Sequence, residues 1–273
     1  VTDSNNCEGK DTLNLTINND IQISVNNDTT ICYGESVKVV ADTLNRIGTP
    51  PYTYQWLPNT NINDSSIIEP TMAPLSSTKY NLTITDSVGC EVKDSFKIYV
   101  EPEISLNLKS DTLICYGDTI SLDVSLNASG SSDTNLIYLW NPIASVDTID
   151  ILSPTVYPLV TTSYIVRVVD TLTQCIIRDT ILVEVNPQIS YNIRADTTIC
   201  FGDSILIDVD TSSIGGSAPF SFLWQPSEGL DYDTALIPLV DTNLSALYIL
   251  TATDSNNCSV IDSFQLSVTP QLS

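Results

Sequence analysis

The sequence repeats itself with a period of about 84 residues, and no other feature constrains the fold as strongly. Two aromatic series keep a spacing of 84 residues: Trp56, Trp140 and Trp224, and Tyr80, Tyr164 and Tyr248. We expect three whole repeats, at residues 20–102, 103–187 and 188–270. Residues 1–19 are expected to be the C-terminal strand region of a preceding repeat, and residues 271–273 the start of a further one. This pattern predicts tandem domains within a longer protein.

Apolar residues alternate with polar ones inside each repeat, which is typical of half-buried β-strands. Repeat 1 shows this at Tyr80, Leu82 and Ile84, and no segment keeps a 3.6-residue helical period. A period near 84 residues is close to the size of an immunoglobulin-type (Ig-type) domain. The sequence therefore predicts an all-β fold of tandem Ig-like (PKD-like) antiparallel β-sandwiches, arranged as a rod.

The three Trp residues share one strand position and one inward-facing parity. A large ring at this position fills the space between the sheets of an Ig-type sandwich. A stripe of aromatic rings could instead form a sugar-binding platform. Because the repeated Tyr residues also fit a structural hydrogen bond to the backbone, we interpret both series as core.

Seven cysteines and no His argue against a zinc site and a Cys–His nucleophile. Cysteines at regular spacing instead favour disulfides, which persist in exported proteins. Two pairings are open. The first joins cysteines within each repeat: Cys32–Cys90, Cys115–Cys175 and Cys200–Cys258. The second joins successive repeats: Cys32–Cys175 and Cys115–Cys258, each 143 residues apart.

Strand direction favours the pairing between repeats. Cys32 precedes the second strand of its repeat, whereas Cys90 follows the sixth. These strands run the same way in an Ig sandwich, so the two cysteines would lie at opposite poles, about 25–30 Å apart. A disulfide requires Cα atoms within about 7 Å. Head-to-tail stacking would instead bring Cys32 towards Cys175, and the remaining cysteines would pair with repeats beyond this sequence.

The chain is strongly acidic, with 33 Asp and Glu against 10 Lys and Arg and a net charge of −23. Such a surface repels nucleic acid and anionic lipid. No apolar run approaches the roughly 18–20 residues that span a bilayer, so we expect no membrane insertion in this segment. No secretory signal is visible in the sequence.

Catalytic chemistry has no clear basis in the sequence. The commonest general base is absent because there is no His, and no hydrolase, phosphate-binding or metalloprotease motif occurs. Most acidic residues recur at equivalent positions, as Asp28, Asp111 and Asp196 do, which indicates architecture rather than an active site. We therefore expect no enzymatic activity and no cofactor.

Calcium is the one cofactor that the acidic residues could bind, since it prefers oxygen ligands. No calcium-loop motif is present. An irregular site could draw on four acidic residues: Asp208, Asp210, Asp231 and Asp233. Simple solvation of these side chains is the alternative.

Four segments carry a family resemblance: CYGESVKVV, GTPPYTYQW, STKYNLTITDSVGC and DSFKIYVEP. Their order resembles that of Ig-like repeats in Bacteroidota cell-surface proteins, such as gliding-motility adhesins of the SprB type, which the type IX secretion system exports. The resemblance covers nearly the whole chain. It implies an extracellular, cell-surface location and a stalk or adhesive role. Repeat 2 departs from the pattern, because NASGSSDTN replaces the Gly-Pro run.

A short motif, Asp-Ser/Thr followed by Ala, Ile, Leu, Val or Thr, occurs twelve times. It resembles the O-glycosylation signal of exported Bacteroidota proteins, although Asp and Thr also suit turns and strand edges. The candidate acceptors are Thr12, Thr29, Thr43, Ser87, Thr112, Thr119, Thr148, Thr171, Thr180, Thr197, Ser204 and Thr234.

Two functions fit the sequence. The first is a stiff, disulfide-linked and glycosylated stalk or extracellular filament with a structural or adhesive role. Its partners would be neighbouring repeats, further copies in a filament, surface glycans or other cells. The second is an array of carbohydrate-binding modules beside an enzyme. A binding array should expose aromatic rings on one loop face, whereas the periodic aromatic residues here fall on inward strand positions.

Overall fold

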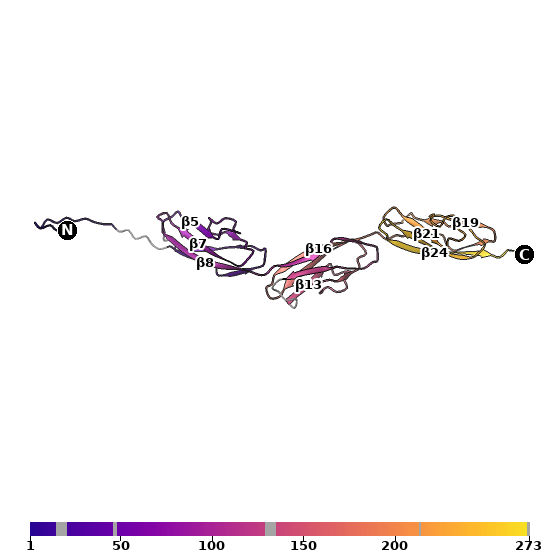
Figure 1. Ribbon diagram of the computed structural model, residues 1–273, viewed down its shortest axis with the longest axis horizontal. Coiled ribbons are helices and arrows are strands. Elements are labelled where there is room, and N and C mark those ends of the chain that lie inside the picture. Colours follow the sequence, from indigo (N-terminus) through magenta and orange to yellow (C-terminus); the bar gives the residue numbers. More distant parts are fainter. Residues whose placement is uncertain (15–20, 46–47, 129–134, 213, 272–273) are drawn as a thin grey trace. The chain divides into compact units, whose positions relative to one another are not determined.

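The computed structural model describes residues 1–14, 21–45, 48–128, 135–212 and 214–271. These residues form β-strands joined by turns, and no α-helix occurs among them (Figure 1). Within the same residues, no helix is present that could cross a membrane. One order of strands occurs three times, once in each predicted repeat.

The strands of repeat 1 are β1 (Gln22–Val25), β2 (Thr29–Ile31), β3 (Val37–Lys38), β4 (Ala41–Asn45), β5 (Thr53–Leu57), β6 (Thr71–Met72), β7 (Thr78–Thr85) and β8 (Glu91–Val100). The strands of repeat 2 are β9 (Ile104–Leu108), β10 (Thr112–Ile114), β11 (Ile120–Ser121), β12 (Val124–Ala128), β13 (Leu136–Asn141), β14 (Thr155–Val156), β15 (Thr162–Asp170) and β16 (Ile176–Val185). The strands of repeat 3 are β17 (Asn192–Ile193), β18 (Thr197–Cys200), β19 (Ser204–Leu206), β20 (Val209–Asp210), β21 (Ser221–Gln225), β22 (Leu239–Asp241), β23 (Ala246–Thr253) and β24 (Ser259–Thr269).

Each repeat contains one four-stranded sheet. The strand orders are β2-β8-β7-β5, β10-β16-β15-β13 and β18-β24-β23-β21. The short edge strand of this sheet (β2, β10 or β18) runs parallel to the last strand of its repeat. The other strand pairs in the sheet are antiparallel. Register is regular on the long strands, where Tyr80 lies opposite Phe96 and Tyr248 opposite Phe264.

Two short ribbons face this sheet in each repeat: β1-β4 with β3-β6, β9-β12 with β11-β14, and β17-β20 with β19-β22. In repeat 1 the chain passes from one ribbon to the other at Val39 and Val40, between β3 and β4. The Val39 amide donates to the carbonyl of Pro70, and the Val40 amide to the side chain of Asn26. In repeats 1 and 3, residues from both layers share one core, as in an Ig-like sandwich. Repeat 2 has the same strand topology, so the fold is all-β.

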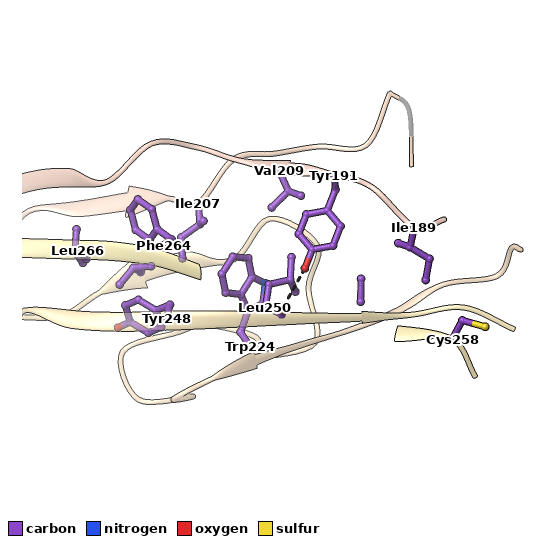
Figure 2. Close-up of a cluster of buried hydrophobic side chains, with 12 residues drawn as sticks. Ile189, Tyr191, Ile207, Val209, Trp224, Tyr248, Leu250, Cys258, Phe264 and Leu266 are labelled. Atoms are coloured by element: carbon purple, nitrogen blue, oxygen red, sulfur yellow. Dashed lines mark hydrogen bonds between the residues drawn. The ribbon is translucent and has the colours of Figure 1, made fainter. Parts of the chain in front are cut away.

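The cores of repeats 1 and 3 are separate clusters of buried side chains. Trp224 and Tyr248 lie at the centre of the repeat 3 core, with Phe264 beside them (Figure 2). Trp56 occupies the same place in repeat 1, where its ring and that of Phe96 form a T-shaped pair at a centroid distance of 6.0 Å. Burial follows strand alternation, as expected for a two-layer sandwich.

The described residues pack into two compact units. One contains repeat 1 together with the turn Thr171–Cys175, and the other contains repeat 3 with most of repeat 2. Each sheet nevertheless draws its strands from a single repeat.

Residues 1–14 are the described part of the segment 1–19. Their side chains are exposed, and an isolated bridge joins Thr2 to Glu8. A single segment with no neighbouring sheet buries no apolar surface, and a strand needs such a neighbour for stability.

Candidate functional site

Two disulfides join different repeats. Cys32 bonds Cys175 with Cα atoms 5.6 Å apart, and Cys115 bonds Cys258 with Cα atoms 5.5 Å apart. Each pair is separated by 143 residues, and these are the two pairs that the strand-direction argument favours. The alternative pairs within repeats are not formed. Cys7, Cys90 and Cys200 are exposed and belong to neither bond.

One cysteine of each bond lies in the turn after the short parallel strand. In repeat 2, Cys115 follows β10, and its carbonyl accepts a hydrogen bond of 3.1 Å from the Asp118 amide. Gly117 has a φ of 88°, a left-handed conformation that glycine adopts without steric cost. This explains why a glycine stands two residues after each such cysteine.

The other cysteine of each bond closes the turn between the two longest strands. In repeat 3, Asp254 organises this turn between β23 and β24. One of its carboxylate oxygens accepts hydrogen bonds from the amides of Asn256 (2.9 Å) and Cys258 (3.0 Å). The Asp254 amide donates to the carbonyl of Cys258 at 2.9 Å, so the aspartate holds the cysteine at both backbone groups.

Asn186 lies in the short linker between repeats 2 and 3 and is only 2% exposed. Its amide donates to the carbonyl of Ile114, and its side-chain NH2 donates to Asp254. Its side-chain oxygen accepts hydrogen bonds from the Ser217 hydroxyl at 2.7 Å and from the Asn256 side chain at 2.8 Å. A buried polar group of this kind is stable only when it is hydrogen-bonded. The linker is thus tied to both repeats.

Asp254 is 5% exposed and holds the centre of this network. Burial alone would raise the pKa of its carboxyl group. Hydrogen bonds from Asn186 and from the amides of Cys258, Ser217 and Asn256 outweigh burial and lower the pKa below its usual range. The group therefore stays ionised and keeps accepting these bonds. We define the polar joint as Asn186, Ser217, Asp254 and Asn256, together with the Cys115–Cys258 bond.

The recurring acidic residues have structural partners. Asp28 accepts a hydrogen bond from the amide of Lys97, Asp111 from that of Leu182, and Asp196 from that of Gln265. Each bond ties the start of the short parallel strand to the last strand of the same repeat. This accounts for the repeated Asp in DTT, DTL and DTT without any catalytic role.

The calcium candidates do not form a cluster. Asp231 uses one carboxylate oxygen to accept hydrogen bonds from the amides of Tyr232 and Leu239, both at 2.8 Å. Asn63 makes the corresponding bond to the Thr71 amide in repeat 1, so the position does not require a charge.

Asp210 caps the Ser212 amide, and its pKa is lowered by that backbone bond and by the Ser212 hydroxyl. Asp208 is exposed and Asp233 is half-buried. Among residues 1–14, 21–45, 48–128, 135–212 and 214–271, no group of three or more His, Cys, Asp or Glu could hold a metal ion.

The O-glycosylation candidates lie mostly on the surface. The exposed ones are Thr12, Ser87, Thr119, Thr148, Thr171, Thr180, Ser204 and Thr234. Thr29, Thr112 and Thr197 are half-buried on the short parallel strands, and the Thr43 side chain lies outside the described residues.

The repeated Trp and Tyr residues are buried and hydrogen-bonded within their own repeats. Trp56, Trp140 and Trp224 are at most 2% exposed. Each indole N–H donates to the carbonyl eleven residues later, at 2.9 to 3.0 Å.

The repeated Tyr hydroxyls bond to the connection that follows the Trp strand. Tyr80 and Tyr248 donate to carbonyls, and Tyr164 shares a hydrogen bond with the hydroxyl of Ser145. Burial raises the pKa of all three Tyr hydroxyls, so they remain protonated donors.

Sequence reasoning missed the polar joint. The available signal was an Asp four or five residues before Cys7, Cys90, Cys175 and Cys258. An Asp at that spacing predicts a side-chain-capped turn. Nothing in the spacing links this turn to Asn186, because that contact depends on how successive repeats meet.

The chain is similar in fold to tandem Ig-domain structures. The I67–I69 fragment of titin matches with a TM-score of 0.40 and 11% identity, over 92% of this chain and 98% of titin's. The eight N-terminal Ig domains of the Down syndrome cell adhesion molecule match with a TM-score of 0.42 and 13% identity, over 91% of this chain and 37% of theirs. Three domains of the bacteriophage RB49 outer capsid protein Hoc match with a TM-score of 0.38 and 12% identity, over 92% and 99% of the two chains. No family model and no curated protein matches the sequence.

Proposed function

We propose that this chain is a structural and adhesive repeat region whose disulfides carry tension from one Ig-like repeat to the next. The supporting observation is that both bonds join different repeats. The loops that they close overlap, because Cys115 lies inside the loop from Cys32 to Cys175. A pulling force therefore reaches Cys258 from Cys32 along a covalent path that bypasses most of the folded sequence.

The mechanical consequence follows from the length of that path. With both bonds intact, the path from Cys32 to Cys258 contains only residues 115–175. After reduction, the whole segment between Cys32 and Cys258 can extend. At about 3.4 Å per residue, reduction should release on the order of 500 Å of additional contour length. This suits a stalk that must not lengthen under load.

Single-molecule pulling tests this role directly. The chain is held at its two ends and stretched, first in oxidising buffer and then in dithiothreitol. We expect the additional contour length only after reduction. A double variant, Cys32→Ser with Cys115→Ser, should behave like the reduced chain in both buffers. An equal extension for the oxidised chain and this variant would refute the mechanical role.

The location that we propose is the bacterial cell surface. Disulfides persist in oxidising, extracellular compartments. The Ig-like repeat pattern resembles surface adhesins exported by the type IX system, which supports that route and a role in gliding motility. Exposed Asp-Thr and Asp-Ser motifs support O-glycosylation of some candidates, such as Thr119 and Thr180. Intact mass measured on the protein from its native surface tests this, because an unmodified mass would exclude glycosylation.

We propose that the chain is not an enzyme, since its recurring acidic residues serve turns and strand ends. Its adhesive partners would be surface glycans, other cells or further copies in a filament. Electron microscopy of the native surface distinguishes single stalks from filaments. Binding of the fragment to a glycan array would instead favour carbohydrate-binding modules.

A further inference from the structure

Cys200 occupies the position in repeat 3 that Cys115 occupies in repeat 2. Cys200 is the last residue of β18, and Cys115 directly follows β10. Each of these short strands runs parallel to the last strand of its repeat. The Cys200 carbonyl accepts a hydrogen bond of 3.0 Å from the amide three residues on, as the Cys115 carbonyl does at 3.1 Å. Gly202 and Gly117 both have a φ of 88°. The two turns therefore present their sulfur atoms from the same backbone geometry.

The residue after the cysteine is aromatic in both turns. Tyr116 lines a small cleft at the polar joint, together with Pro187, Cys258 and Val260. Phe201 stands at the equivalent place in repeat 3 and is 43% exposed. An aromatic ring thus directly follows the cysteine in both turns, and the two rings have similar exposed fractions, 40% for Tyr116 and 43% for Phe201.

The turn that carries Cys258, which is the partner of Cys115, has a second copy near the start of the sequence. The sequence TDSNNC occurs at residues 2–7 and again at 253–258. Asp3 accepts hydrogen bonds from the amides of Asn5 (2.8 Å) and Cys7 (2.9 Å), matching the bonds that Asp254 makes in the joint. Residues 1–14 form no sheet, so these six residues fold into the turn locally. A cysteine in such a turn is presented in advance for bonding.

We propose that Cys200 forms a third disulfide between repeats, with the cysteine of an Asp-x-x-x-Cys turn in a further Ig-like domain. This inference rests on the proposed function and extends it to a partner. The supporting observation beyond the cysteine itself is that the equivalent cysteines of repeats 1 and 2 are both bonded to the cysteine after the second-last strand of the next repeat. In the Cys115–Cys258 bond this cysteine closes an Asp-x-x-x-Cys turn, and in the Cys32–Cys175 bond the turn is one residue longer. Phe201 would then line the joint as Tyr116 does.

The chemistry requires an external disulfide such as oxidised glutathione. The Cys200 thiolate attacks one sulfur of glutathione disulfide, forms a mixed disulfide and releases one reduced glutathione. The partner thiolate then attacks the Cys200 sulfur and releases the second glutathione. Two thiols lose two protons and two electrons in total, and one glutathione disulfide is reduced to two thiols.

An extended chain supplies the partner. Residues 270–273, PQLS, stand where PQIS stands at 187–190. A second copy of residues 191–270 is therefore appended directly after Ser273. In the appended copy only, Cys200→Ser removes a competing thiol, and Ser259→Thr marks the peptide that carries its turn cysteine. The protein is oxidised with glutathione disulfide, alkylated, and mapped without reduction.

We expect a linked peptide between Cys200 and the marked cysteine. Alkylation of Cys200 should fall at least about tenfold relative to the unextended chain, because linkage in one chain gives a high effective concentration. In the control, Cys200→Ser in the original repeat 3, the marked cysteine should become alkylated. The Cys115–Cys258 peptide serves as the folding standard in every sample.

Three results would overturn the inference when the Cys115–Cys258 peptide is intact: an alkylated Cys200, a Cys200 capped by glutathione, or a Cys200 bonded to another cysteine. Each would leave the proposed function standing. Loss of the Cys115–Cys258 peptide itself would contradict the proposed function as well, so the two failures are distinguishable.

Discussion

The side-chain amide of Asn186 donates a hydrogen bond to the carboxylate of Asp254, although 68 residues separate them. Both side chains are at least nine-tenths buried. The bond joins the linker after repeat 2 to the turn that carries Cys258. The joint between these repeats is therefore held by a buried polar network as well as by a disulfide.

Replacing Asp254 with Asn tests this network. Asp254→Asn places an NH2 group where one carboxylate oxygen accepts hydrogen bonds from the Asn186 side chain and the Ser217 amide. These two N–H donors would then face another donor and lose their acceptor. We expect a loss of about 1–3 kcal/mol, the typical cost of leaving a buried polar group unsatisfied. Urea unfolding measures the change. Asp203→Asn, at an exposed side chain, should have little effect, and equal stability of the two variants would contradict the role of the network.

Tyr191 should make repeat 3 sensitive to alkaline pH. Burial, with a smaller contribution from the Asp262 charge, raises its pKa to about 12. The unfolded pKa is about 10. A raised folded pKa gives stability that is fully present below pH of about 10 and is lost as pH rises through about 12. Tyr191 donates to the carbonyl of Leu250 at 3.0 Å (Figure 2).

The measurement is unfolding free energy against pH for the chain and for Tyr191→Phe. The variant should be less stable at neutral pH and should lose stability less steeply between pH of about 10 and 12. Ionisation of the other buried Tyr residues accounts for the pH dependence of the unfolding free energy that remains in the variant. Identical slopes would show that Tyr191 does not contribute.

Because the cores of repeats 1 and 3 are separate, a substitution in one core should destabilise only its own repeat. Trp224→Ala removes a fully buried ring and its hydrogen bond to the Ala235 carbonyl, at an expected cost of about 3–5 kcal/mol. Hydrogen exchange should accelerate in β21, β23 and β24 and stay unchanged in β5, β7 and β8. Trp56→Ala, the matched variant in repeat 1, should give the opposite pattern. Faster exchange in both repeats after either change would indicate one continuous core.

Asp231 should tolerate a neutral replacement. Asn63 makes the equivalent hydrogen bond in repeat 1, so Asp231→Asn should keep the caps on Tyr232 and Leu239. Asp231→Ala should lose about 1 kcal/mol, as expected for removal of a hydrogen bond. Thermal unfolding with and without millimolar calcium measures both variants. A calcium-dependent rise in Tm that Asp231→Asn abolishes would instead reveal a calcium site.

Much of the fold follows from the sequence because its signals are local. Strand alternation around Trp56 and Tyr80 predicts which side chains are buried, and the direction of two strands is enough to favour Cys32–Cys175 over Cys32–Cys90. These inferences need only the geometry of one sandwich and the reach of a disulfide.

The polar joint could not be predicted in the same way. Asn186 looks like an ordinary linker residue, and its partners Ser217, Asp254 and Asn256 are 31, 68 and 70 residues away. Their contact depends on the orientation of one repeat against the next, which no spacing encodes. The short parallel pairing of β2 with β8 is likewise invisible, since three residues carry no periodicity.

The most direct test of the account is disulfide mapping of the unmodified, unreduced chain by mass spectrometry. Linked repeats predict two crosslinked peptides, one joining Cys32 to Cys175 and the other joining Cys115 to Cys258. A peptide that joins Cys32 to Cys90, or Cys115 to Cys175, would contradict the account, because bonds of that kind leave successive repeats joined only by the main chain.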